Sequence, residues 1–233
     1  MVYDASVTNY RRNFVPGGSF FFTVNLADRH SRLLTEEIDL LREAFRSARG
    51  RRPFTLDAIV VLPEHLHAIW TLPPRDADYS TRWRLIKTLF SRGIAPTERP
   101  ARSRLSKGER GIWQRRYWEH TLRDEGNFER HCDYIHFNPV KHGHVRATAA
   151  WPHSSFHRFV KVGVYPVDWA SGGEVEGIAF GQRGKGSELM GIAELVLSKV
   201  EGLNPSYDFD FDNGDRGNDD KDNDNSAWAV RPG

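Results

Sequence analysis

The sequence predicts an α+β protein with a ferredoxin-like β-α-β-β-α-β core, an antiparallel sheet and one additional helix. The first observation is the order of the segments, because apolar, β-branched stretches and helix-like stretches follow one another in that order. The second is the pair of strand-like stretches at 58–62 and 65–72, which only Pro63-Glu64 interrupts. The third is composition, since 233 residues that are 39% hydrophobic suffice for one large domain with a core.

The core elements follow one another over the first half of the chain. We expect a strand at about 19–26, a helix at about 35–48, strands at about 54–62 and 65–72, a helix at about 80–93, and an extended segment at about 113–122. The additional helix is expected at about 126–138, where Asp124 and Asn127 are candidate caps and Phe128 to Phe137 contains no Gly or Pro. Pro139 disfavours helix at the preceding residue, so this helix should end at Asn138 or one residue earlier.

His65 and His67 lie in the strand at 65–72. Residues two apart in a strand share a face, so both imidazoles point the same way, and the alternate residues form an apolar face. Two neutral imidazoles on one rigid strand form half of a site for a divalent metal ion. By itself such a triplet is more often a packing or surface feature. Glu64 could orient an imidazole, although an exposed loop carboxylate is the simpler interpretation.

Tyr134 and Asn138 are four residues apart on the additional helix and share one helical face. A tyrosine hydroxyl beside an amide oxygen that binds the same metal would complete a site with a nucleophile and a metal ion. A helical tyrosine is most often a core or interface residue, so only the combination with the paired histidines supports this hypothesis. The nearby His131, His136, His142 and His144 are expected to serve as helix-end charges or phosphate contacts rather than ligands.

Charge is distributed unevenly along the chain. Residues 1–170 carry 27 Lys and Arg against 18 Asp and Glu, whereas residues 171–233 carry 6 against 13. A basic body suits a polyanionic partner, although charge that serves solubility is an equal alternative. Aromatic residues among the basic ones favour single-stranded DNA, whose bases can stack on rings. The candidate DNA contacts in this region are Arg82, Arg84, Lys87, Arg115 and Arg116.

Cysteine content, hydropathy and local composition predict the cellular compartment and the division into domains. Cys132 is the only cysteine, and the sequence shows neither a signal-peptide pattern nor an apolar stretch of membrane-span length, so we expect a cytoplasmic protein without membrane contact. We expect a catalytic domain at 1–171, an extension with a short helix at 172–205, and an acidic, disordered tail at 206–233. Competition between this tail and DNA for the basic surface is a further hypothesis.

Five blocks of the sequence resemble, in the same order, the REP-associated tyrosine transposases, which are single-tyrosine transposases with the His-hydrophobic-His (HUH) motif. The resemblance covers roughly residues 9–183. The blocks are Tyr10-Arg11-Arg12 through Phe20-Phe21-Phe22-Thr23, Leu62-Pro63-Glu64-His65-Leu66-His67 through Pro73, Trp113 to His120, Tyr134-Ile135-His136-Phe137-Asn138-Pro139 through Gly143, and Trp151 to His157.

The resemblance implies that Tyr134 is the catalytic nucleophile and that His65, His67 and Asn138 hold magnesium or manganese. The same donors would also accept zinc or cobalt, so the sequence does not select the ion. Contacts to DNA near the foot of a hairpin are implied for Arg11 and Arg12. Lys141 is a candidate contact to the scissile strand, with a plain surface charge as the equal alternative.

The implied reaction is metal-assisted transesterification on single-stranded DNA at REP-like hairpins, through a 5′-phosphotyrosine intermediate. The metal is needed because a phenol is mostly protonated at neutral pH. Three alternatives remain: a hairpin DNA or RNA binding module that does not cleave, a relaxase-like nickase, and a metallohydrolase that dispenses with Tyr134. The resemblance leaves two assemblies open, a homodimer that shares its active sites and a monomer.

Overall fold

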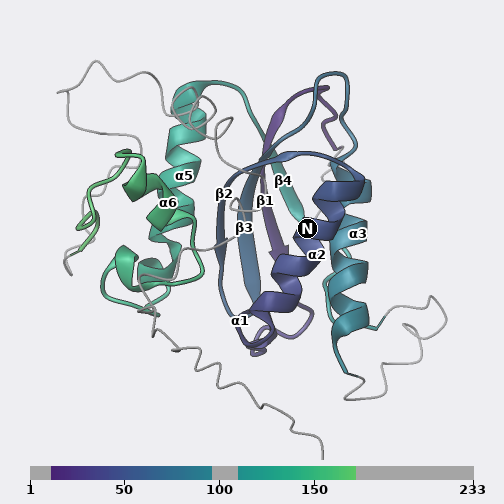
Figure 1. Cartoon of the computed structure of the whole chain (residues 1–233), viewed down its shortest axis with the longest axis horizontal. Helices are drawn as coiled ribbons and strands as arrows, with labels where there is room; N and C mark the ends of the chain where they lie inside the picture. The colour runs from purple at the N-terminus through teal and green to yellow at the C-terminus, as the bar shows by residue number, and fades with distance from the viewer. Residues whose placement is uncertain (1–11, 96–109, 172–233) are drawn as a thin grey trace, which may run out of the picture.

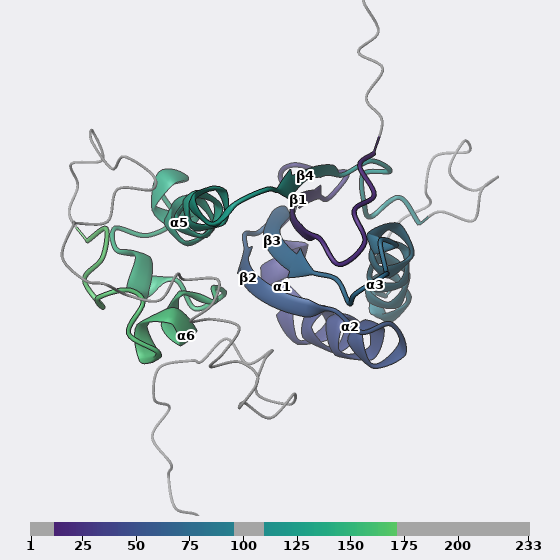
Figure 2. The same ribbon diagram turned by 90° about the horizontal axis from the view of Figure 1, so that it is seen from above.

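The computed structural model describes residues 12–95 and 110–171 as a four-stranded antiparallel sheet between two helical layers. The strand order is β2-β3-β1-β4. Helices α2 and α3 cover one face of the sheet, and α5 and α6 lie on the other (Figures 1 and 2). The β-α-β-β-α-β succession and the antiparallel sheet confirm the predicted α+β fold class.

The elements run in chain order as β1 Ser19–Asn25, α1 Leu33–Glu36, α2 Ile38–Arg51, β2 Thr55–Val61, β3 His65–Thr71, α3 Tyr79–Gly93, β4 Trp118–Leu122, α5 Glu125–Lys141 and α6 Phe156–Lys161. A short 3-10 turn at Thr148–Ala150 precedes α6. All seven predicted segments are present within a few residues of their expected positions, except that the extended segment is divided. Helices α1 and α6 were not expected.

Strand alternation divides the core into two halves. Phe22 on β1 and Trp70 on β3 face α2 and α3, where Trp70 stacks on Trp83 of α3 at a centroid distance of 4.2 Å. On the opposite face, Phe21 and Ile69 pack against α5. The predicted apolar face of the 65–72 segment is therefore confirmed, and the two histidines belong to the α5 side of the sheet.

Helix α5 extends past its predicted end and continues through Pro139 to Lys141. Proline in the last turn removes only one intrahelical hydrogen bond, and burial of Asn138 and Pro139 against the domain overrides the local preference. The helix closes with His144 donating its backbone N–H to the Pro139 carbonyl at 2.9 Å, while Gly143 adopts φ +71°. This is a Schellman closure, in which the left-handed residue is usually glycine.

The predicted extended segment at 113–122 is divided by a bulge. Trp113 forms an isolated bridge with Leu26, whereas Trp118 begins β4 opposite Thr23. The second segment therefore contains two more residues than β1 between these two pairings, which is a β-bulge. The bulge exposes two neighbouring side chains, Arg115 and Arg116.

Several predictions lie outside the described residues: Arg11, the short helix and extension at 172–205, the acidic tail at 206–233 and its competition with DNA. The division at residue 171 stays a prediction. Within 12–95 and 110–171, no helix combines the length and apolar character that a membrane crossing requires. The cytoplasmic location also stays a prediction.

Candidate active site

The two histidines of β3 lie side by side under α5. Their ring centroids are 5.0 Å apart, and both side chains are about 4% exposed. Each Nδ1 has a partner: His65 Nδ1 lies 2.8 Å from Glu64 Oε1, and His67 Nδ1 lies 2.9 Å from Thr23 Oγ1. These contacts fix both rings and leave the Nε2 atoms as the remaining ligand atoms. His67 Nε2 is buried and has no hydrogen-bond partner in the described part of the chain.

The surroundings of both imidazoles lower their pKa and so favour the neutral form. Burial lowers the pKa of His67 well below its ordinary value, and the nearby His65 and His142 lower it further. Burial also lowers the pKa of His65, although the charge and hydrogen bond of Glu64 act in the opposite direction. A neutral imidazole offers a lone pair to a cation, so both rings are residues that could hold a metal ion.

The Glu64 side chain contacts His65 and is not an exposed loop carboxylate. The interpretation of Glu64 as an exposed loop carboxylate was therefore wrong. The side chain is 17% exposed. Burial acts to raise the Glu64 pKa, but the charge and hydrogen bond of His65 outweigh burial and the net pKa is lowered. Glu64 is therefore an anion that orients His65.

A stripe of α5 side chains faces the histidine pair. Tyr134, Asn138 and His142 are spaced four residues apart, so they share one helical face. The Tyr134 ring lies 5.2 Å from the His67 ring, and the His142 ring lies 5.3 Å from the His65 ring. Asn138 lies one helical turn from both Tyr134 and His142 and is fully buried, and its Oδ1 and Nδ2 find no hydrogen-bond partner among the described residues. The structure therefore brings the predicted nucleophile and all three predicted ligands into one cluster.

Contacts on the other faces of α5 fix this stripe in place. Asp124 caps the helix, as predicted, by accepting from the Asn127 backbone N–H at 2.7 Å. The Tyr165 hydroxyl donates to buried Asp133 at 2.6 Å. His136 is fully buried on another face of the helix and pairs with Ser155 Oγ at 2.9 Å, so the expectation that it serves as a helix-end charge or phosphate contact was wrong. The bonds to Tyr165 and Ser155 are buried and tie α5 to the chain that follows it.

Tyr134 is half-buried and has a cation beside it. Lys141 Nζ lies 4.8 Å from the centroid of the Tyr134 ring. Phe21 packs edge-on against the same ring at 5.9 Å. Lys141, predicted from the sequence as a contact to the scissile strand, therefore lies next to the candidate nucleophile.

Four of the predicted DNA contacts line a basic pocket on the opposite side of the sheet, against α3. The pocket has a volume of about 570 Å³, and its lining includes Arg12, Arg84, Lys87, Trp113, Arg115 and Tyr117. Arg12 lies over the Tyr117 ring at 4.6 Å. Lys87 donates to the Gln114 carbonyl at 3.0 Å, and burial, followed by repulsion from Arg12, lowers the Lys87 pKa to about 8. Aromatic walls with a cationic rim suit single-stranded nucleic acid.

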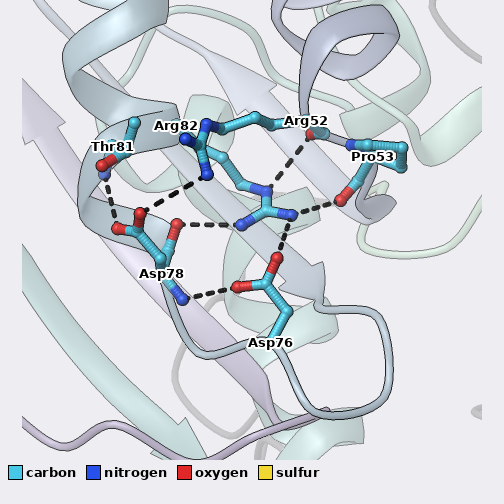
Figure 3. A network of polar contacts seen from close by, with 6 residues as sticks. All are labelled: Arg52, Pro53, Asp76, Asp78, Thr81 and Arg82. Carbon is cyan, nitrogen blue, oxygen red and sulfur yellow. Dashed lines mark hydrogen bonds and ion pairs between the residues drawn. The ribbon is translucent and has the colours of Figure 1, made fainter.

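Arg82 does not belong to this pocket, which corrects the prediction that it contacts DNA. Its side chain is 1% exposed and its guanidinium is fully engaged within the fold (Figure 3). It donates to the carbonyls of Arg52, Pro53 and Asp78 at 3.3, 2.6 and 2.9 Å, and to Asp76 Oδ2 at 2.7 Å. These bonds join the start of α3 to the end of α2, which is a structural role.

Sequence reasoning missed Thr23 as a functional residue. It ends an apolar stretch, Phe20-Phe21-Phe22, and lies opposite His67 across the strand pair. A signal was available, because the ferredoxin-like order places the first and third strands side by side. The polar residues of the first strand, Ser19, Thr23 and Asn25, alternate with apolar ones and so mark the face on which the histidines lie.

Comparisons with known proteins agree with the family resemblance found in the sequence. No family model matches the chain. The REP-associated tyrosine transposase of Escherichia coli (strain K12) is 46% identical over 177 residues, which cover 76% of this chain and 98% of the relative. A relative from Haemophilus influenzae is 44% identical over 164 residues, covering 70% and 93%. A solved REP-associated tyrosine transposase bound to a REP hairpin is 45% identical with a TM-score of 0.61, covering 76% of this chain and 98% of that one.

Proposed function

This chain belongs to the REP-associated tyrosine transposases, and we propose that Tyr134 is the nucleophile with which it cuts and rejoins single-stranded DNA at REP-like hairpins. The observation that carries this assignment is the 5.2 Å between the rings of Tyr134 and His67. A phenol from α5 and a neutral imidazole pair from β3 meet at one point, although 67 positions of sequence separate Tyr134 from His67.

Two exchanges of phosphate esters make up the proposed reaction. Tyr134 Oη forms a bond to a backbone phosphorus while the bond from that phosphorus to the 3′ oxygen breaks. The tyrosine gives up its proton, and the released 3′ oxygen takes one, leaving a 5′-phosphotyrosine and a free 3′-hydroxyl. A 3′-hydroxyl of the same or another strand then attacks the phosphorus and frees Tyr134. One ester replaces another throughout, so rejoining requires no ATP.

The residues of the site fit a divalent ion, and we assign His65, His67 and Asn138 as its ligands. The buried His67 Nε2 and the buried Asn138 amide, which have no hydrogen-bond partners in the described residues, are the atoms that such an ion would satisfy. Magnesium or manganese is the proposed ion, although imidazole nitrogens with an amide oxygen also suit zinc. When bound, the ion supplies Lewis-acid stabilisation of charge on the scissile phosphate.

Other residues orient the reacting groups. Glu64 and Thr23 hold the Nδ1 atoms of His65 and His67 and so fix the two rings. Lys141 places a positive charge beside Tyr134, where a backbone phosphate must approach. The contacts that anchor α5 keep Tyr134 at a constant distance from the histidines.

Hairpin DNA with single-stranded flanks is the proposed partner. The solved relative is bound to a REP hairpin, and the basic pocket of this chain offers cations and rings together. We assign DNA contacts to Arg12, Arg84, Lys87 and Arg115 in the pocket and to Arg116 in the adjoining bulge. A DNA contact by Arg11 and a homodimer both stay predictions.

A covalent adduct assay tests the proposal. The full chain is incubated with a labelled REP-type hairpin and magnesium, and adducts are resolved under denaturing conditions. We expect an adduct from the wild type, none from Tyr134→Phe, and a large loss from His67→Ala, each with hairpin affinity retained. His30→Ala is the matched control, because His30 is an exposed histidine outside the site.

The same assay separates the proposal from two of the three alternatives, the binding module and the metallohydrolase. A binding module that does not cleave would retain hairpin affinity and give no adduct from the wild type. A metallohydrolase or a different nucleophile would let Tyr134→Phe cleave the strand, and that result would falsify the assignment of Tyr134.

A further inference from the structure

We propose that Trp118, backed by His120 and His131, is a stacking platform for one unpaired nucleobase next to the scissile phosphate. The inference rests on the proposed function, because the nucleophile defines where the scissile phosphate lies. It adds a binding subsite on the α5 face of the sheet, separate from the basic pocket on the α3 face.

Strand register places Trp118 close to the candidate active site. Thr23 of β1 lies opposite His67 of β3 on one side and opposite Trp118 of β4 on the other. The three residues therefore form one row across the sheet, on the same face. Neighbouring strands are about 4.8 Å apart, so Trp118 begins about 10 Å from His67, measured along the row. This separation is short enough for one strand of DNA to contact both.

Stacked rings form a continuous surface that leads from Trp118 toward Tyr134. Trp118 and His120 are parallel within 2° at a centroid distance of 5.7 Å, and His120 stacks on His131 of α5 at 5.1 Å. Phe21 lies beneath this surface and contacts Trp118, His131 and Tyr134 at 5.6, 4.8 and 5.9 Å. Phe21 is buried, so it gives these stacked rings a rigid base. We name Trp118, His120 and His131 the ring shelf.

Trp118 is exposed to solvent at the outer end of the ring shelf. Its side chain is 49% exposed, whereas Trp70 and Trp83 are fully buried, and no other tryptophan of the described chain is among its exposed large hydrophobic residues. Trp118 directly follows the bulge that exposes Arg115 and Arg116, and bulges commonly occur beside active sites, where they redirect side chains. A single exposed ring is not by itself a binding site, so the support for the ring shelf comes from the histidine rings stacked behind Trp118 and from the cations beside it.

The charges around the shelf identify the ligand class. Arg116 lies two residues before Trp118, Arg130 is an exposed residue one turn before Tyr134, and Lys141 lies over the Tyr134 ring. A single exposed ring with cations nearby matches one nucleobase with its flanking phosphates. An apolar protein partner would need a wider patch without this charge.

An abasic scan tests the shelf. A labelled REP-type hairpin receives one abasic nucleotide at a time across its single-stranded flank, and its affinity for the full chain is measured for each position. In the wild type we expect one position at which base removal weakens binding about tenfold. In Trp118→Ala that position should lose its effect while the others keep theirs, and Trp118→Phe should restore most of it. Val167→Ala, at an exposed apolar residue away from the shelf, is the matched control.

This scan measures binding alone, so it stands apart from the nucleophile assignment. If the wild type gives no adduct but the scan shows the Trp118-dependent position, the proposed chemistry fails and the shelf stands. If every abasic position has the same effect in Trp118→Ala as in the wild type, the shelf is wrong. A change of oligomeric state in Trp118→Ala with an unchanged scan would make the ring a contact between copies of the chain, which also overturns the proposal.

Discussion

Replacement of Arg82 by alanine separates a structural role from a DNA-binding role. The guanidinium is fully buried and donates four hydrogen bonds within the fold, three to backbone carbonyls and one to Asp76. Arg82→Ala leaves those carbonyls without their donor and Asp76 without its cation. We therefore expect a loss of folding stability with little direct effect on DNA affinity.

The structure sets the size of this loss. Removing one partner of a buried ion pair lowers the free energy of unfolding by about 3–5 kcal/mol. The lower end applies here, because the Asp76 side chain is 32% exposed and water can replace its partner. A loss of about 3 kcal/mol corresponds to a melting temperature lowered by about 6–12 °C for a protein of this size. Because the hydrogen bond from Arg82 lowers the pKa of Asp76, this part of the stability is present above the ordinary carboxyl pKa and is lost as pH falls through the lowered value.

Urea unfolding at neutral pH measures the free energy of unfolding directly. Arg84→Ala is the matched control, since Arg84 is an exposed arginine on the same helix and should change stability by less than about 0.5 kcal/mol. Hairpin affinity, measured well below the transition, should decrease in Arg84→Ala and remain near the wild-type value in Arg82→Ala. An Arg82→Ala protein as stable as the wild type but weakened in DNA binding would refute the reasoning.

Three further predictions follow from the site, the pocket and the fold. Thr23→Val removes the partner of His67 Nδ1 and should weaken manganese binding about 10–100-fold by calorimetry, whereas Thr23→Ser should bind like the wild type. Hairpin affinity should decrease about fivefold as pH rises from 7 to 9, because Lys87, with a pKa of about 8, loses its charge; Lys87→Arg should remove this part of the pH dependence in anisotropy titrations. Gly143→Ala should destabilise the chain by about 1 kcal/mol in urea, since φ is +71°, whereas Gly50→Ala, within α2 and free of nearby atoms, should not destabilise it.

Local patterns predicted the elements and the two separate parts of the site. The alternation at 65–72 gave the common face of His65 and His67, and the spacing of Tyr134 and Asn138 gave their common helical face. Each pattern involves only residues close together in the sequence, so tertiary contacts do not change which of these residues share a face. The interpretation of Arg82 failed although a local signal existed. Arg82 falls in the buried stripe of Tyr79, Trp83 and Ile86, while Arg84 lies outside it.

Non-local contacts could not be read in the same way. The partner of His67 is Thr23, which belongs to another strand 44 residues away. The end of α5 depends on tertiary burial of Asn138 and Pro139, which overrides the local preference of a residue before proline. The bulge before β4 appears only when the register of β1 is known.

The two faces of the sheet explain why the bulge matters for function. Tyr117 lines the basic pocket on the α3 side, whereas the next residue, Trp118, joins the ring shelf on the α5 side. At the β2 edge, the chain around Ser154 bridges Val60 and covers the strand, while β4 has no further strand paired to it among the described residues. The pocket and Tyr134 lie on opposite faces of the sheet, so a DNA strand that contacted both would have to cross from one face to the other. Arg115 and Arg116 are exposed directly before β4, between the pocket and the ring shelf, so they are the cations placed to contact a strand that takes the β4 edge.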